Sequence, residues 1–175
     1  VIISRISTES FGIFDLVKSF FLSKSTTIFL LAMIIIFIGQ MIAQLFLGNS
    51  YYRLGEYSTF IYYLAPSMNT VINRPWTVIT SVFIHGGFSH IILNGIVLFF
   101  VGSTLENLIG KKKFAYLFFG AGAISAIAQI AVTSPDVVVL GASGAILGIL
   151  GSLTVLAPKM PVFLFFLIPM PLWVL

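Results

Sequence analysis

Long runs of apolar residues dominate the chain, and short polar stretches separate them. A helix needs about 20 uncharged residues to cross the roughly 30 Å hydrocarbon core of a bilayer. Four runs come close to that length and a fifth begins at Met160: residues 26–48, 89–105, 114–134, 137–157 and 160–175. The fifth run has 16 residues, or about 24 Å of helix, which is short of a full crossing. The pattern predicts an all-α, polytopic transmembrane helix bundle.

Composition also predicts a membrane protein, and it limits the kinds of reaction that the chain could catalyse. Apolar residues make up 59% of the chain and charged residues 8%, and the mean hydropathy is +1.12, values that exclude a water-soluble domain. Cysteine is absent, which excludes disulfides and thiolate chemistry. The sequence also has no HExxH pattern, no carboxylate pair within a span and no glycine-rich phosphate loop, so we predict no metal or organic cofactor.

The charged residues predict the orientation of the bundle. Two basic residues, Arg53 and Arg74, lie between the first two spans, and the other seven lie on the opposite side: Arg5, Lys18, Lys24, Lys111, Lys112, Lys113 and Lys159. The positive-inside rule then places the N-terminus in the cytoplasm. The net charge of +4 reflects this topology and requires no nucleic acid. We expect an integral multi-pass protein of a prokaryotic cell membrane, in contact with membrane lipids.

Two regions outside the spans are distinctive. Residues 1–25 have apolar positions at helical spacing that are interrupted by Asp15 and Lys18, which predicts a segment lying in the membrane interface rather than crossing it. Residues 26–175 form the predicted transmembrane domain. Its first loop, 49–88, is long and aromatic, and Tyr and Trp favour the headgroup level. We therefore expect this loop to associate with the outer leaflet beside a hydrated cavity.

Three polar residues are expected at one depth within the bundle. His90 and Asn94 are four residues apart near the outer end of the second span, so they share a helix face. Ser143 lies near the outer end of the fourth span, which runs in the same direction. Polar groups inside a membrane are candidate functional groups. His85, just before two glycines, is interpreted as a structural loop residue.

These residues suit acyl transfer, in which a nucleophile needs a base and donors that stabilise an oxyanion. Ser143 supplies the hydroxyl, and His90, Asn94 and the Ser143 backbone N–H supply donors. Gly141 and Gly144 leave space around the hydroxyl. Other interpretations stay open: small residues four apart, such as Gly144, Gly148 and Ser152, commonly pack transmembrane helices, and His90 and Asn94 could be structural groups or line a transport path.

The combined pattern resembles the rhomboid family of intramembrane serine proteases. It comprises H-x4-H-x3-N at His85, His90 and Asn94, then Glu106 in the same span, and G-A-S-G beginning at Gly141. The segment around Trp76 resembles the family's Trp-Arg region, although Arg74 precedes the tryptophan here. The resemblance implies a rhomboid-like fold and an intramembrane serine endopeptidase that cuts in or near the transmembrane segments of client proteins.

The resemblance also implies roles for individual residues. Ser143 would be the nucleophile of a Ser/His dyad, and His90, Asn94 and Gly141 would line the oxyanion site. His85 and Gly144 would be structural groups near the site, and Glu106 would be a structural bonding group far from it. The fifth run would correspond to a mobile gate helix.

One departure from the family pattern leaves alternatives open. The family's general base is a histidine on a sixth span, which is not found in residues 1–175. Either that span lies beyond residue 175, so that both ends of the chain are fragment boundaries and this chain alone has negligible activity, or the protein is a noncatalytic pseudoprotease that binds membrane clients. A third alternative makes His90 the base. The oligomeric state is left open.

Overall fold

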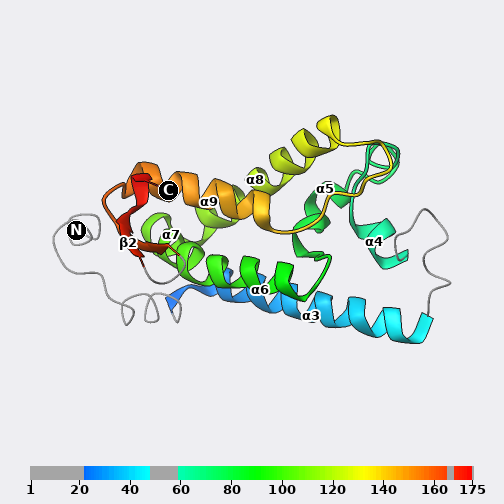
Figure 1. Cartoon of the computed structure of the whole chain (residues 1–175), viewed down its shortest axis with the longest axis horizontal. Coiled ribbons are helices and arrows are strands. Elements are labelled where there is room, and N and C mark those ends of the chain that lie inside the picture. The colour runs from blue at the N-terminus through cyan, green and yellow to red at the C-terminus, as the bar shows by residue number, and fades with distance from the viewer. Residues whose placement is uncertain (1–21, 48–58, 165–167, 175) are drawn as a thin grey trace.

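The computed structural model describes residues 22–47, 59–164 and 168–174, and these residues form a helical bundle with one small hairpin (Figure 1). The expected segment 1–25 lies largely outside the described residues. The long helices are α3 (Lys24–Leu47), α6 (Phe88–Val97), α8 (Lys111–Val132) and α9 (Ser143–Leu156). The shorter elements are α4 (Thr59–Leu64), α5 (Thr77–Thr80), η2 (Ser81–Phe83), η3 (Leu98–Gly102), α7 (Ser103–Ile109), β1 (Pro161–Leu164), β2 (Ile168–Pro171) and η4 (Leu172–Val174).

Three of the predicted spans are confirmed as helices of membrane-crossing length. Within the described residues, Lys24–Phe46, Phe88–Ile109 and Lys111–Val132 are long and apolar enough to cross a bilayer. The second of these is continuous through the π-helical turn η3. A π-turn disturbs the regular backbone bonding, and two hydroxyls bond there instead: Ser103 Oγ donates to the Phe99 carbonyl and Thr104 Oγ1 to that of Phe100.

The fourth helix begins later than predicted. α9 starts at Ser143 rather than at residue 137, and its 14 residues span about 21 Å. The preceding residues are held by the first loop, because the Val139 N–H donates to the Pro66 carbonyl (2.8 Å) and the Gly141 N–H donates to the Ser81 carbonyl (2.9 Å). These bonds take up N–H groups that a longer helix would have used.

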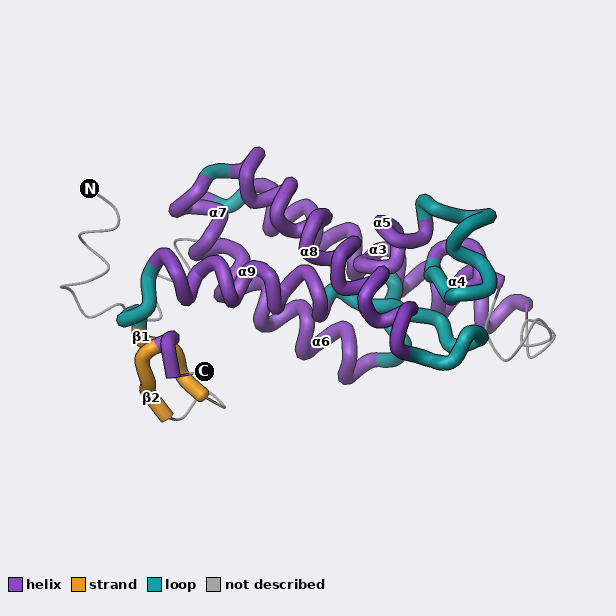
Figure 2. The backbone as a smooth tube through the Cα atoms, turned by 90° about the horizontal axis from the view of Figure 1, so that it is seen from above, coloured by secondary structure: helices purple, strands orange, loops and turns teal. Residues whose placement is uncertain are grey.

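The predicted fifth helix, and with it the gate helix, is wrong for the described residues. β1 and β2 form an antiparallel hairpin in which Pro161 pairs with Pro171 and Val162 with Met170. Proline lacks an N–H and clashes with the preceding turn of a helix, so Pro161, Pro169 and Pro171 oppose a helix throughout this stretch. The hairpin lies at the opposite end of the bundle from α4 and α5 (Figure 2).

The two helices on which the site depends are held by close backbone approach. A Cβ on Gly144 would lie 2.2 Å from Ser125 Oγ, and one on Gly148 would lie 2.3 Å from Ala121 Cβ. α8 and α9 therefore meet through small residues four apart, as transmembrane helices commonly do. Beside this contact, the Phe29 ring stacks on Phe118 with centroids 4.6 Å apart in the main apolar core.

Glu106 joins the second span to the start of the first. Its carboxylate accepts from the Ser25 N–H, the Thr26 N–H and Thr26 Oγ1, each at 2.8 Å, and the side chain is 4% exposed. A carboxylate at a helix N-terminus satisfies unpaired N–H groups and complements the helix dipole. Glu106 is therefore a bonding group between helices, as expected from the sequence.

Candidate active site

Ser143 is the first residue of α9, and its side chain is exposed. The loop residue before it, Ala142, is fully buried and acts as the N-cap without a side-chain hydrogen bond to the helix. The first N–H groups of a helix have no partner within it. The Ser143 hydroxyl and backbone N–H therefore both lie at the positive end of the α9 dipole.

The ring of His90 lies directly against Gly141, two residues before the serine. A Cβ on Gly141 would be 2.6 Å from both Cε1 and Nε2 of His90. Gly141 also has φ = +108°, a backbone conformation that residues with a side chain rarely adopt. Only glycine satisfies both conditions without strain, so the first glycine of G-A-S-G allows α6 and the start of α9 to come together.

Asn94 is buried one turn further along α6 and bonds within its own helix. Its Nδ2 donates to the His90 carbonyl at 3.0 Å, and the side chain is 7% exposed. An amide nitrogen carries two hydrogens, so this bond uses one of two donors. The bond also fixes the Asn94 side chain against the turn that carries His90.

His85 lies behind His90 and is almost completely buried, at 1% exposure. The two imidazole rings meet edge to face with centroids 5.0 Å apart. His85 Nδ1 is 3.2 Å from the Phe83 carbonyl, whereas Nε2 has no hydrogen-bond partner. Desolvation, followed by the neighbouring His90, lowers the pKa of His85 from 6.5 to about 4. His85 is therefore neutral near pH 7.

Gln40 in α3 holds the backbone of His85 from the other side. Its Nε2 donates to the His85 carbonyl (3.1 Å), and its Oε1 accepts from the His85 N–H (3.2 Å). Gln40 was not among the residues predicted from the sequence, although a glutamine within an apolar span is itself a signal. Two serines were missed as well: Ser81, which accepts from Gly141, and Ser125, which packs on Gly144.

The described part of the first loop is tied together by its aromatic and basic residues. The Arg74 guanidinium lies 3.5 Å from the centroid of the Tyr62 ring and donates to the Tyr62 carbonyl. Trp76 Nε1 donates to the Tyr63 carbonyl at 3.1 Å. The segment that resembles the Trp-Arg region therefore fastens α5 to α4.

The structure thus brings His85, His90 and Gly141 together, with Asn94 bonded to the same turn as His90 and Ser143 two residues after Gly141. Gly144 faces α8 rather than open space, so the packing interpretation holds for that residue.

A cavity of about 640 Å³ lies elsewhere, between α3 and α6, and its lining includes none of these residues. Within the part of the chain that the structure describes, no group of three His, Asp or Glu could hold a metal ion.

The apolar spans define a multi-pass integral membrane protein, and the candidate site lies at the start of α9. Residues 73–175 match the Rhomboid domain family, which is more than half of the chain. The chain belongs to the rhomboid family, and the resemblance drawn from its motifs is confirmed.

Three similar proteins illustrate the range of the family. The putative rhomboid protease YdcA of Bacillus subtilis (strain 168) is 37% identical over 43% of this chain and 38% of its own length. The rhomboid protease GluP of the same organism is 37% identical over 47% of this chain and 16% of its own. Rhomboid protein 1, mitochondrial, of Saccharomyces cerevisiae is 33% identical over 56% of this chain and 30% of its own length. The chain therefore spans well under half the length of these relatives.

Proposed function

We propose that this protein is an intramembrane serine endopeptidase that hydrolyses peptide bonds in or near the transmembrane segments of client proteins. The observation that carries the proposal is the exposed Ser143 at the start of α9, two residues after the glycine against which His90 packs. Two of the similar proteins are named as rhomboid proteases, which supports the same reaction class.

The arrangement suits stabilisation of the oxyanion. When Ser143 Oγ attacks a carbonyl carbon, negative charge moves to the carbonyl oxygen, and donors near that oxygen lower the barrier. The Ser143 N–H lies at the uncapped end of α9, where the dipole favours an anion. His90 and the second Nδ2 hydrogen of Asn94 are the side-chain donors of the proposal.

The reaction follows the usual course of acyl transfer. A base accepts the Ser143 hydroxyl proton as Oγ bonds to the carbonyl carbon. The C–N bond then breaks, and the base returns the proton to the departing amine. Water attacks the resulting ester, which releases the second product and restores the hydroxyl. Because α-helical carbonyls are hydrogen-bonded internally, clients with helix-weakening residues at the cleavage point are the favoured substrates.

We assign the base to a histidine outside residues 1–175. His85 is buried behind His90, and His90 is needed as a donor, so neither suits the role. One face of α9 is available for a further helix, because Ser143, Leu147, Gly151 and Val155 are all exposed and recur every four residues. Space beside Gly151 is open, which would permit close approach of a partner helix.

The second candidate function is that of a pseudoprotease that binds membrane clients without cutting them. It is favoured by the absence of a suitable base among the described histidines. A fluorophosphonate probe applied to the full-length protein distinguishes the two functions. We expect labelling that Ser143→Ala abolishes and that Ser89→Ala, an exposed serine at the start of α6, leaves intact. A folded full-length protein that binds a client peptide but is never labelled would establish the noncatalytic function.

A further inference from the structure

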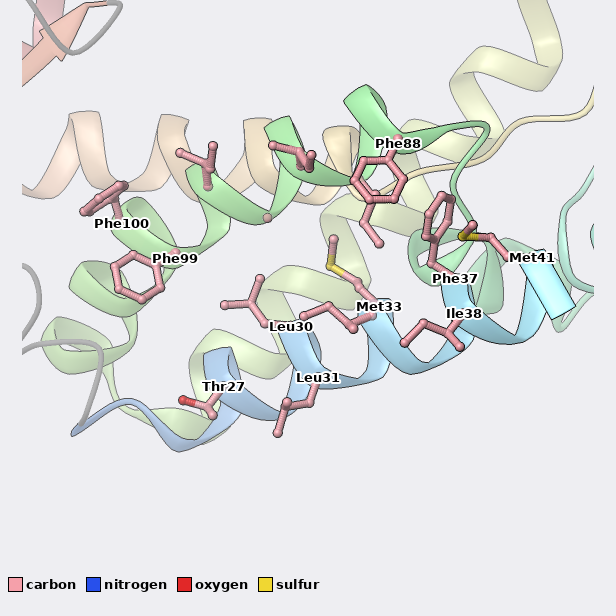
Figure 3. A pocket seen from close by; sticks show the side chains of 15 residues that line it. Thr27, Leu30, Leu31, Met33, Phe37, Ile38, Met41, Phe88, Phe99 and Phe100 are labelled. Carbon is pink, nitrogen blue, oxygen red and sulfur yellow. The ribbon is translucent and has the colours of Figure 1, made fainter.

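An apolar groove of about 640 Å³ runs between the first two spans (Figure 3). Its walls come from α3 on one side and from α6 and η3 on the other, including Leu31, Ile34, Ile38, Ile92, Gly95 and Phe99. The one polar lining residue, Thr27, donates its hydroxyl to the Ser23 carbonyl at 2.7 Å. The groove therefore offers its occupant no free hydrogen-bonding side chain, which suits a hydrocarbon.

Gly95 leaves the floor of this groove open. A Cβ there would lie 3.8 Å from Leu30 Cδ2, an ordinary contact. The position therefore has room for a side chain, and the sequence provides none. A larger residue at position 95 would extend into the groove without clashing with the backbone.

The face of α3 that lines the groove continues to a lysine at one end. Lys24, Thr27 and Leu31 follow the three- and four-residue spacing that keeps side chains on one helix face. Lys24 is exposed and is the first residue of α3, so its ammonium group is accessible to an external anion.

Within the described residues, neither carboxylate forms an ion pair with Lys24. Glu106 uses its two oxygens on the Ser25 and Thr26 donors. Asp136 accepts from Asn69 at 2.7 Å, in the loops beyond the other end of α3. The groove therefore ends at an exposed positive charge.

We propose that this groove binds an acyl chain of an anionic phospholipid whose phosphate contacts Lys24. From Thr27 to Met41 the lining covers 14 residue steps, or about 21 Å of helix, whereas one leaflet contributes about half of the roughly 30 Å core. A chain anchored at the Lys24 end fits within that length. The lysine can extend its ammonium group to the headgroup level while its stem covers apolar surface. This lipid site is independent of the proposed peptidase activity.

Native mass spectrometry of the purified, delipidated protein tests the site. The protein is titrated with dioleoyl phosphatidylglycerol and, separately, with dioleoyl phosphatidylcholine, so that only the headgroup differs. We expect tighter retention of the anionic lipid. Lys24→Gln should weaken retention of phosphatidylglycerol about fivefold, from about 1 kcal/mol per lysine near an anionic lipid surface, and should leave that of phosphatidylcholine unchanged. Lys112→Gln, which removes the same charge from α8, a helix that does not line the groove, is the matched control.

Gly95→Leu tests the hydrocarbon part of the site. It should reduce retention of both lipids at least threefold while the thermal midpoint stays near that of the parent protein. Ile92→Trp, at an exposed groove residue, gives a second test should Gly95→Leu unfold the protein. Equal retention of the two lipids, or equal effects of the Lys24 and Lys112 variants, would overturn the headgroup contact. Unchanged retention in both groove variants, or displacement of lipid only by a transmembrane peptide, would assign the groove to another occupant.

Discussion

His90 and Gly141 touch across the site, with the imidazole ring occupying the place where a side chain at position 141 would begin. The contact is 2.6 Å from an ideal Cβ at position 141 to the ring, and the glycine has φ = +108°. Both the backbone conformation of Gly141 and its contact with the His90 ring therefore require glycine, two residues before the candidate nucleophile Ser143.

Gly141→Ala should disturb the site more than it disturbs the fold. The methyl group must move the His90 ring or the backbone, and the left-handed conformation adds about 1–2 kcal/mol of strain. We expect fluorophosphonate labelling of Ser143 in the full-length protein to fall at least tenfold, with a lower unfolding midpoint. Gly120→Ala is the control, because a Cβ on that exposed glycine meets nothing within 4 Å. Equal labelling of both variants would show that the His90–Gly141 contact does not position the serine.

Acid should destabilise the protein through His85. Its pKa is about 4 when folded and 6.5 as the unperturbed value, so between these pH values the unfolded chain binds more protons and stability falls as pH falls. Between pH 7.5 and pH 5 the loss is about 2 kcal/mol. His85→Gln should remove this share of the pH dependence. The check is the free energy of unfolding of both proteins at the two pH values, and parallel pH profiles would contradict the assignment to His85.

Glu106→Gln should strongly weaken the join between the first two spans. The amide NH₂ would face a backbone N–H that now donates to a carboxylate oxygen, and charge-assisted bonds of this kind contribute about 1.5–3 kcal/mol each. We expect a loss of at least 2 kcal/mol in the free energy of unfolding in micelles. Asp136→Asn removes a carboxylate from an exposed pair and should cost less than about 1 kcal/mol. Similar losses in the two variants would mean that Glu106 is not a principal anchor.

The sequence was a good guide to the spans, because uninterrupted apolar length is a direct physical requirement of the bilayer. It was a poor guide to where α9 begins, because residues 137–140 are as apolar as the residues of a membrane-spanning helix. The N–H groups of Val139 and Gly141 donate to carbonyls of the first loop, those of Pro66 and Ser81, and such long-range bonds leave no periodic signal. The hairpin was missed because apolar length was given more weight than three prolines.

The candidate site was also predicted only in part from the sequence. The motif placed His90 and Ser143 near one level, but it could not show that Gly141 receives the His90 ring or that Asn94 bonds back to its own helix. The link between Gln40 and His85 joins residues 45 positions apart. No pattern in a single sequence indicates that two such distant residues are bonded.

The contact between α8 and α9 should respond to exchange of small residues across it. Gly148→Ala places a methyl group 2.3 Å from Ala121 Cβ, and overpacking typically costs about 1–3 kcal/mol. Adding Ala121→Gly should recover part of that loss, which a double-mutant cycle of unfolding free energies measures as a coupling of about 1 kcal/mol. Gly120→Ala, at an exposed position of α8 where a Cβ meets nothing within 4 Å, should be neutral or slightly stabilising. Additive effects of the two substitutions would show that the helices separate rather than interlock here.

The orientation of the bundle can be tested cleanly because the chain has no cysteine. Lys112→Cys and Ser134→Cys, made separately, each place a single thiol at an exposed position near one end of α8. The lysine distribution puts position 112 in the cytoplasm. In intact cells, a membrane-impermeant maleimide should therefore label the Ser134→Cys variant and should label the Lys112→Cys variant only after permeabilisation. The opposite pattern would invert the topology and would place the candidate site and its water supply on the cytoplasmic side.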